Sequence, residues 1–148
     1  MRLKGTSKGD RLIGSAGDDS VSGGRGNDWI EGAQGNDTLT GGEGRDTFVF
    51  RANSGHDVIT DFDVRTPDYI LLDSQTGVYD GYLGGHMGKL YDGFEVYNSF
   101  GTHVATLHSV DADGDGDLDS QFVMASGATL TLTDVHVTDL TGYMLFGG

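Results

Sequence analysis

Five aspartates recur every nine residues in the first third of the chain: Asp10, Asp19, Asp28, Asp37 and Asp46. Carboxylates stacked in such a series repel each other unless cations lie between them. Calcium takes about six to eight oxygen ligands and mixes carboxylate with backbone carbonyl oxygens. Turn propensity does not require aspartate at one fixed place, so purely solubilising turn residues are the weaker interpretation. The series therefore predicts divalent-cation binding.

Each aspartate stands at the sixth place of a nonapeptide, and an apolar residue follows at the eighth place. The five units read GTSKGDRLI, GSAGDDSVS, GGRGNDWIE, GAQGNDTLT and GGEGRDTFV. Glycine at the first place, and at the fourth place in most units, permits positive φ angles and close backbone approach. One short strand per unit cannot bury its apolar side chain alone. Units of this length therefore predict a solenoid whose core forms only through stacking.

These units resemble the repeats-in-toxin (RTX) family, whose pattern is G-G-x-G-x-D-x-U-x. The resemblance implies an all-β, right-handed parallel β-roll with calcium between its turns, two nonapeptides forming one coil. It pairs Asp10 with Asp28, Asp19 with Asp37, and Asp28 with Asp46. The first unit departs from the pattern at Thr6 and Lys8.

About three to five ions are expected in the roll. Their ligands would be aspartate carboxylates and backbone carbonyls of the glycine-rich turns. The resemblance places these ligands at Asp10, Gly14, Ala16, Gly17, Asp19, Gly23, Arg25, Gly26, Asp28, Gly32, Gln34, Gly35, Asp37, Gly42, Gly44, Asp46, Asp57 and Asp61.

The segment from Phe48 to Phe62 looks like the exit segment of RTX rolls. There Asp57 and Asp61 would close the last sites, and Phe50 and Phe62 would cover the end of the roll. We therefore predict a β-roll over 1–63 and a β-rich cap over 64–148. The cap is expected to be antiparallel, because short apolar runs alternate there with glycine and aspartate turns. These runs are 69–72, 94–97, 103–107, 121–124 and 128–133.

A second acidic cluster lies within the expected cap: Asp111, Asp113, Asp115, Asp117 and Asp119. Its opening matches D-x-D-x-D-G, the first half of an EF-hand loop. The match then fails, because Phe122 stands where a bidentate glutamate is needed. Two interpretations remain open, namely one further calcium ion and an acidic turn between two strands.

Composition restricts the partners of the chain. Its 148 residues carry a net charge of −14, which disfavours nucleic acid and anionic membranes. Cysteine is absent, so neither disulfides nor thiolate chemistry is available. No stretch reaches membrane-spanning length, and the first residues lack the apolar core of a signal peptide. Because the repeat register begins mid-unit, we expect a fragment of a larger protein.

No constellation for catalysis is evident: there is no zinc-protease helix motif, nucleophile elbow or phosphate loop. We expect a non-catalytic module of a secreted protein that folds when it binds extracellular calcium and supports type I secretion. The last residues, 127–148, loosely resemble an uncleaved export signal, although 143–146 could equally form a last strand. The alternative is a polysaccharide-binding module like those of RTX-bearing mannuronan epimerases. Few basic residues support it, and the outward Trp29 and the cap tyrosines could equally be packing residues.

Overall fold

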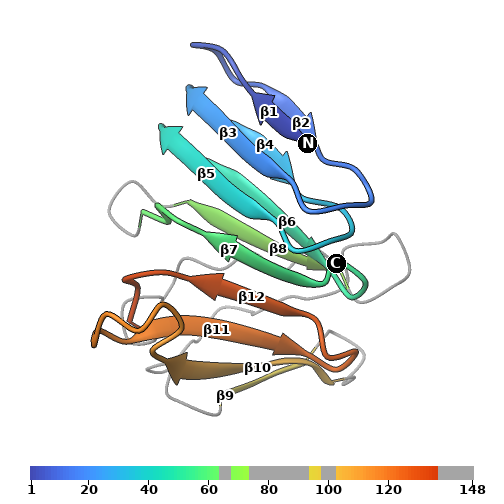
Figure 1. Ribbon diagram of the computed structural model, residues 1–148, viewed down its shortest axis with the longest axis vertical. Helices are drawn as coiled ribbons and strands as arrows, with labels where there is room; N and C mark the ends of the chain where they lie inside the picture. Colours follow the sequence, from blue (N-terminus) through green and yellow to red (C-terminus); the bar gives the residue numbers. More distant parts are fainter. Residues whose placement is uncertain (64–67, 74–93, 98–102, 137–148) are drawn as a thin grey trace.

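The chain forms a β-solenoid that continues into an antiparallel sheet, as the computed structural model shows (Figure 1). The structure describes residues 1–63, 68–73, 94–97 and 103–136. In these ranges all regular elements are strands, and no helix could span a membrane. The roll comprises β1 (Arg2–Lys4), β2 (Arg11–Ile13), β3 (Ser20–Arg25), β4 (Trp29–Glu31), β5 (Thr38–Glu43), β6 (Thr47–Arg51), β7 (His56–Ile59) and β8 (Tyr69–Asp73).

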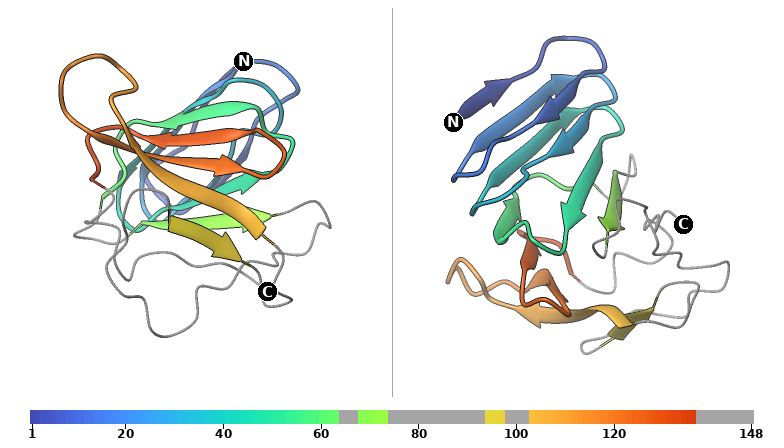
Figure 2. Two further views of the ribbon diagram at one scale, coloured as in Figure 1. Left: turned by 90° about the horizontal axis from the view of Figure 1, so that it is seen from below. Right: turned by 90° about the vertical axis from the view of Figure 1, so that its right-hand side faces the viewer.

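Two nonapeptides make one coil, as the resemblance implied. Odd-numbered strands of the roll stack in parallel in one sheet, and even-numbered strands stack in parallel in the other. Leu3 pairs with Val21 in the first sheet, and Leu12 pairs with Ile30 in the second. The strands of a sheet are therefore two units apart in sequence, and Figure 2 shows the two sheets facing each other.

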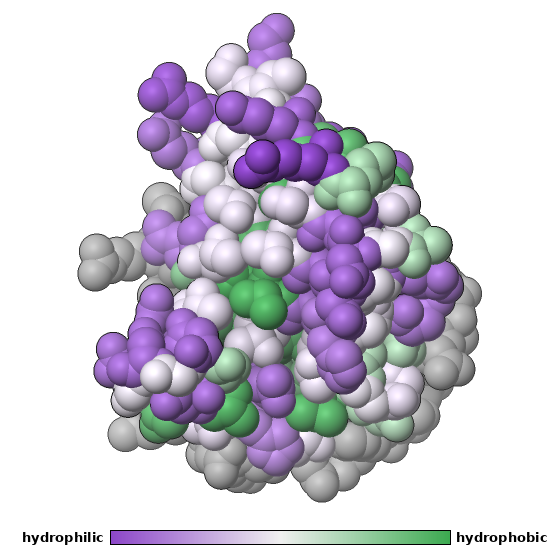
Figure 3. All heavy atoms as spheres, in the orientation of Figure 1, coloured by the Kyte–Doolittle hydropathy of each residue, from purple (hydrophilic) through white to green (hydrophobic). Residues whose placement is uncertain are grey.

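The eighth place of each unit forms the core between the sheets. Val21, Ile30, Leu39, Phe48 and Ile59 are at most 1% exposed. Leu3 and Leu12 of the first coil are only partly buried, because they lie at the open end of the stack. Successive side chains of a strand point to opposite faces, so the polar seventh and ninth places mostly remain outside. Over the described residues, the face drawn in Figure 3 is accordingly mostly hydrophilic or neutral.

The expected antiparallel cap is present and extends one of the roll's sheets. It contains β9 (Phe94–Tyr97), β10 (His103–Val110), β11 (Asp119–Met124) and β12 (Thr129–Leu132). Strands β9 to β12 are antiparallel neighbours, whereas β12 pairs in parallel with β7. Leu107, Phe122 and Leu130 continue the core, each fully buried. Strand β12 thus covers the edge that β7 would otherwise expose.

One strand differs from the sequence expectation. Residues 69–72 were assigned to the antiparallel cap, but β8 pairs in parallel with β6 and completes the fourth coil of the roll. The reason is that Asp68-Tyr69-Ile70 repeats the aspartate-x-apolar triplet of the units, and Ile70 fills the core position. The expected tail segment 143–146 and the tyrosines at 79, 82 and 91 lie outside the described residues.

Candidate metal centre

The sixth-place aspartates form two columns, one along each edge of the roll. All but Asp57, which lies within β7, directly precede a strand, and the turns that follow odd and even strands lie at opposite edges. One column contains Asp10, Asp28, Asp46 and Asp68, and the other contains Asp19, Asp37 and Asp57. The structure thus brings together all three pairs that the resemblance implied.

Within each column a backbone amide links every aspartate to the next carboxylate. The amide of Asp10 donates to Oδ1 of Asp28 at 2.8 Å, and the amide of Asp28 donates to Oδ1 of Asp46 at 2.9 Å. In the other column, the amides of Asp19 and Asp37 donate to Asp37 and Asp57 at 2.8 and 3.0 Å. The amino group of Met1 makes the equivalent contact with Asp19. One oxygen of each carboxylate except that of Asp10 is therefore engaged by the coil before it.

The second carboxylate oxygen, Oδ2, has different surroundings in the inner coils. Oδ2 of Asp28, Asp37, Asp46 and Asp57 is buried and, among the described residues, receives no hydrogen bond. These side chains are at most 2% exposed. Leaving an ionised carboxylate oxygen buried without a donor costs several kcal/mol. Cations bound along the two columns would satisfy these four oxygens.

Burial changes the protonation of these aspartates. Desolvation is the largest cause and raises the pKa of Asp28, Asp37 and Asp46 above the ordinary value. The same cause raises the pKa of Asp57 to about 8 and that of Asp68 to about 6. A bound cation would reverse this effect, since a nearby positive charge favours the ionised carboxylate.

The first-place glycines make room for these carboxylates. A Cβ atom at Gly23 would overlap Oδ2 of Asp28, and one at Gly41 would overlap Oδ2 of Asp46. Gly32 stands in the same relation to Asp37. The buried oxygens thus lie directly against backbone, where carbonyl groups of the turn are close at hand. Unsatisfied carboxylate oxygens beside glycine-rich turns fit a hard divalent ion such as calcium.

The family comparison agrees with this geometry. A family model described as "RTX calcium-binding nonapeptide repeat (4 copies)" matches residues 4–39 and 13–48. Residues 4–48 are RTX calcium-binding repeats. No curated protein matches the chain. Among solved structures, the AlgE6R3 subunit of the Azotobacter vinelandii mannuronan C5-epimerase is similar at 24% identity. That match covers 96% of this chain and 80% of the other, with a TM-score of 0.34.

Most carbonyl ligands expected from the RTX resemblance lie in the turns that carry the aspartates: Gly14, Ala16, Gly17, Gly26, Gly32, Gln34, Gly35 and Gly44. The other three, Gly23, Arg25 and Gly42, lie within strands β3 and β5. Neighbouring turns are also linked by direct hydrogen bonds. The amide of Gly26 donates to the carbonyl of Glu43, and the amide of Gly35 donates to that of Ser54. The same turns therefore hold the coils together and surround the aspartates.

The exit of the RTX roll has two closing aspartates with different surroundings. Oδ2 of Asp57 is one of the oxygens without a donor. Asp61 instead accepts the amides of Gly41 and Gly42, each at 2.8 Å. Phe50 and Phe62 are buried as expected, and Phe62 packs against Phe48 with ring centroids 6.2 Å apart.

Sequence reasoning missed Asp68, which occupies the sixth place of the last coil. Its Oδ1 accepts the amide of Asp46 at 2.9 Å, and its Oδ2 accepts the amide of Asp63 at 2.8 Å. The signal was present in the triplet Asp68-Tyr69-Ile70. It was hidden because the spacing from Asp46 is 22 residues, whereas earlier aspartates of one column are 18 apart.

The acidic loop after the RTX roll joins β10 to β11 and contains two groups of exposed carboxylates. Oxygens of Asp111, Asp113 and Asp115 lie within 4.8 Å of one another, as do those of Asp115, Asp117 and Asp134. Asp134 comes from the end of β12, so only the hairpin brings it to this loop. It could not be assigned to the loop from the sequence.

Asp119 has a different position from the rest of the acidic loop. It is fully buried, and its two carboxylate oxygens accept the amides of Ala112 and Asp134, both at 2.8 Å. The sequence analysis counted Asp119 among the candidate ligands. In the structure its carboxylate anchors the two ends of the loop.

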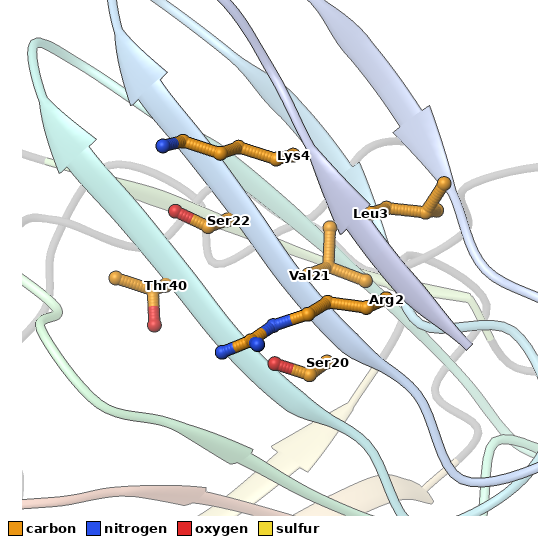
Figure 4. Close-up of a pocket in the computed structure, with 7 residues that line it drawn as sticks. All are labelled: Arg2, Leu3, Lys4, Ser20, Val21, Ser22 and Thr40. Atoms are coloured by element: carbon orange, nitrogen blue, oxygen red, sulfur yellow. The ribbon is translucent and has the colours of Figure 1, made fainter.

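A hollow of about 550 Å³ lies beside the first strands of the RTX roll (Figure 4). Arg2 and Lys4 lie along it with the hydroxyl groups of Ser20, Ser22 and Thr40, while Leu3 and Val21 point to the other side of the strands. On the second sheet, the guanidinium of Arg11 lies over the ring of Trp29, 5.8 Å from its centroid. The outward Trp29 is thus packed against an arginine of the neighbouring strand.

Proposed function

We propose that this chain is a non-catalytic module of a secreted protein that folds and is stabilised when calcium fills its RTX roll. One observation carries the proposal: four buried aspartate oxygens lie without donors at the sixth places of the inner coils. Without a cation, the roll combines like-charge repulsion with a glycine-rich backbone of high conformational entropy. Sixth-place aspartates of the inner coils hold the ion, and turn carbonyls complete its oxygen ligands.

The expected size of the calcium effect is large for a chain of this length. Each site filled at about ten times its dissociation constant contributes roughly 1.4 kcal/mol. Four sites would contribute about 6 kcal/mol, which is comparable to the whole stability of a small domain. Extracellular modules bind calcium with dissociation constants of about 10⁻⁴–10⁻³ M. The chain would therefore remain expanded at the low calcium level of a cytosol, pass an exporter, and fold outside.

Circular dichroism with calcium titration tests this coupling. We expect a largely disordered spectrum in EDTA and a β spectrum that appears cooperatively as calcium is added. Magnesium at equal concentration should be far less effective, because it demands octahedral geometry and dehydrates reluctantly. An unchanged β spectrum after exhaustive removal of calcium would contradict the proposal.

The acidic loop offers one further site in this proposal. Asp111, Asp113 and Asp115 would supply the carboxylates, together with Asp117 or Asp134 from the second group. All of these side chains are exposed, so the ion would be held weakly. Replacing Asp113 and Asp115 by asparagine should remove a weak binding event in calorimetry and leave the cooperative folding transition intact.

A second candidate function is polysaccharide binding at the hollow beside β1. The observation that favours it is the pairing of Arg2 and Lys4 with three hydroxyl groups, because these side chains suit an acidic, hydroxyl-rich ligand. Calorimetry with polyuronate oligosaccharides at low salt tests it. Heat that disappears in an Arg2→Ala, Lys4→Ala variant would support the function, and no heat would exclude it for these ligands.

A further inference from the structure

The nonapeptide turns of the roll adopt two conformations. In the third, fourth and fifth units, the second and fourth places both have positive φ. The residues and their φ values are Gly24 (112°), Gly26 (109°), Ala33 (78°), Gly35 (123°), Gly42 (103°) and Gly44 (131°). Residues 5–22 contain no positive φ, although Gly17 could adopt one. The difference is therefore a property of the whole turn and does not simply follow glycine content.

The two conformations provide different partners for the aspartate that ends the turn. In the first unit, the amide and the hydroxyl of Thr6 both donate to Oδ2 of Asp10, at 2.6 and 2.8 Å. In the second, the amide and the hydroxyl of Ser15 donate to Oδ2 of Asp19, at 2.5 and 3.0 Å. In the later units the corresponding Oδ2 receives no donor from the described residues.

We propose that Thr6 and Ser15 take the place of calcium in the first two turns, so that ions bind from the third turn onward. An ion at Oδ2 of Asp10 or Oδ2 of Asp19 would have to displace two hydrogen bonds to a charged oxygen, which disfavours binding there. An ion at Asp28, Asp37 or Asp46 displaces none.

This inference rests on the proposed calcium binding and predicts which aspartates hold ions. Native mass spectrometry in saturating calcium counts the ions on the full chain. We expect Asp10→Asn and Asp19→Asn to leave the count unchanged, and Asp28→Asn and Asp37→Asn to lower it by at least one. The slope of melting temperature against the logarithm of calcium concentration reports the ions released on unfolding. This slope should be unchanged in Asp10→Asn and Asp19→Asn and smaller in Asp28→Asn and Asp37→Asn.

Two results would overturn the inference and leave the calcium function standing: loss of an ion in Asp10→Asn, or an unchanged count in Asp28→Asn. If the wild-type chain bound no calcium, the proposed function itself would fail.

Because inner-coil variants could fail to fold, a double variant, Thr6→Gly with Ser15→Gly, provides an independent test. It should raise the ion count, or tighten the weakest site at least tenfold. No change in either quantity would contradict the exchange of hydroxyl for ion, and Thr6→Ser with Ser15→Thr, which keeps both hydroxyl donors, is the matched control.

Discussion

The backbone amide of Asp46 donates a 2.9 Å hydrogen bond to Oδ1 of Asp68, which extends the aspartate column into the last coil of the roll. Asp68 is 2% exposed and also accepts the amide of Asp63. A single carboxylate thus joins the fifth nonapeptide turn to the segment that enters β8. The roll does not end at the last recognisable nonapeptide, because the same link is made once more by a residue outside the strict repeat.

Replacing Asp68 by alanine should lower the free energy of unfolding by about 3 kcal/mol, because two amides lose a charged acceptor in a buried place. Urea denaturation in saturating calcium measures this change. Lys8→Ala, at an exposed side chain of the first turn, is the control and should change stability by less than about 0.5 kcal/mol. Equal effects of the two variants would show that the column does not extend to Asp68.

Gly41→Ala should abolish ion binding at Asp46, because the new Cβ atom would overlap Oδ2 of Asp46 and lie 3.1 Å from Cζ of Phe48. Gly17→Ala is a matched control in another turn. A Cβ atom there meets nothing within 4 Å, and neither glycine has positive φ. Calorimetric titration should show fewer calcium ions for Gly41→Ala and an unchanged number for Gly17→Ala. Normal binding by Gly41→Ala would mean that the carboxylate does not need this space.

Ala33→Gly should raise the free energy of unfolding by about 0.5–1 kcal/mol. Ala33 has a φ of 78°, and a left-handed conformation costs an L-residue about 1–2 kcal/mol, partly offset by the greater chain entropy of glycine. Ala16→Gly is the opposite control, since Ala16 lies in a turn without positive φ and should be destabilised by glycine. Thermal melts in saturating calcium compare the two. A loss of stability in both variants would contradict the assigned conformation at Ala33.

Without calcium, the chain should become more stable as the pH falls from about 8 towards 5. The pKa of Asp57 is raised to about 8 and that of Asp68 to about 6, so the folded state binds protons that the unfolded state releases. Protonation therefore favours the fold below about pH 8 and is lost as the pH rises through that value. The β signal of circular dichroism in EDTA reports the folded fraction, which should rise as the pH falls across this range, and Asp57→Asn should flatten that rise.

Saturating calcium should reverse this pH dependence, because protons then compete with the ion for the same carboxylates. Stability in calcium should fall as the pH decreases below about 6. In EDTA, by contrast, a stability that increased with pH would contradict the previous prediction. It would show that the buried aspartates already have hydrogen-bond or charge partners in the metal-free chain.

The sequence by itself determined the coil. The RTX resemblance supplied the three aspartate pairs. Aspartate at the sixth place and an apolar residue at the eighth are sufficient to predict stacked strands and the core of Val21, Ile30 and Leu39. These features follow from short-range spacing, which a linear repeat expresses directly. The strands of the antiparallel part were predictable for the same reason, since alternation within a run depends only on neighbouring residues.

Tertiary structure alone decided which oxygens are satisfied and where the columns end. Thr6 and Gly24 occupy the same place of their units, yet only the fold shows that Thr6 donates to Asp10 while Asp28 keeps an oxygen without a donor. The hairpin of β11 and β12 likewise brings Asp134 to Asp115, and β12 to β7. Hydrogen-bond donors and ion ligands are counted in three dimensions. The repeat therefore predicts a calcium-binding roll. It does not show in which turns the aspartate oxygen is satisfied by a side chain and in which by an ion.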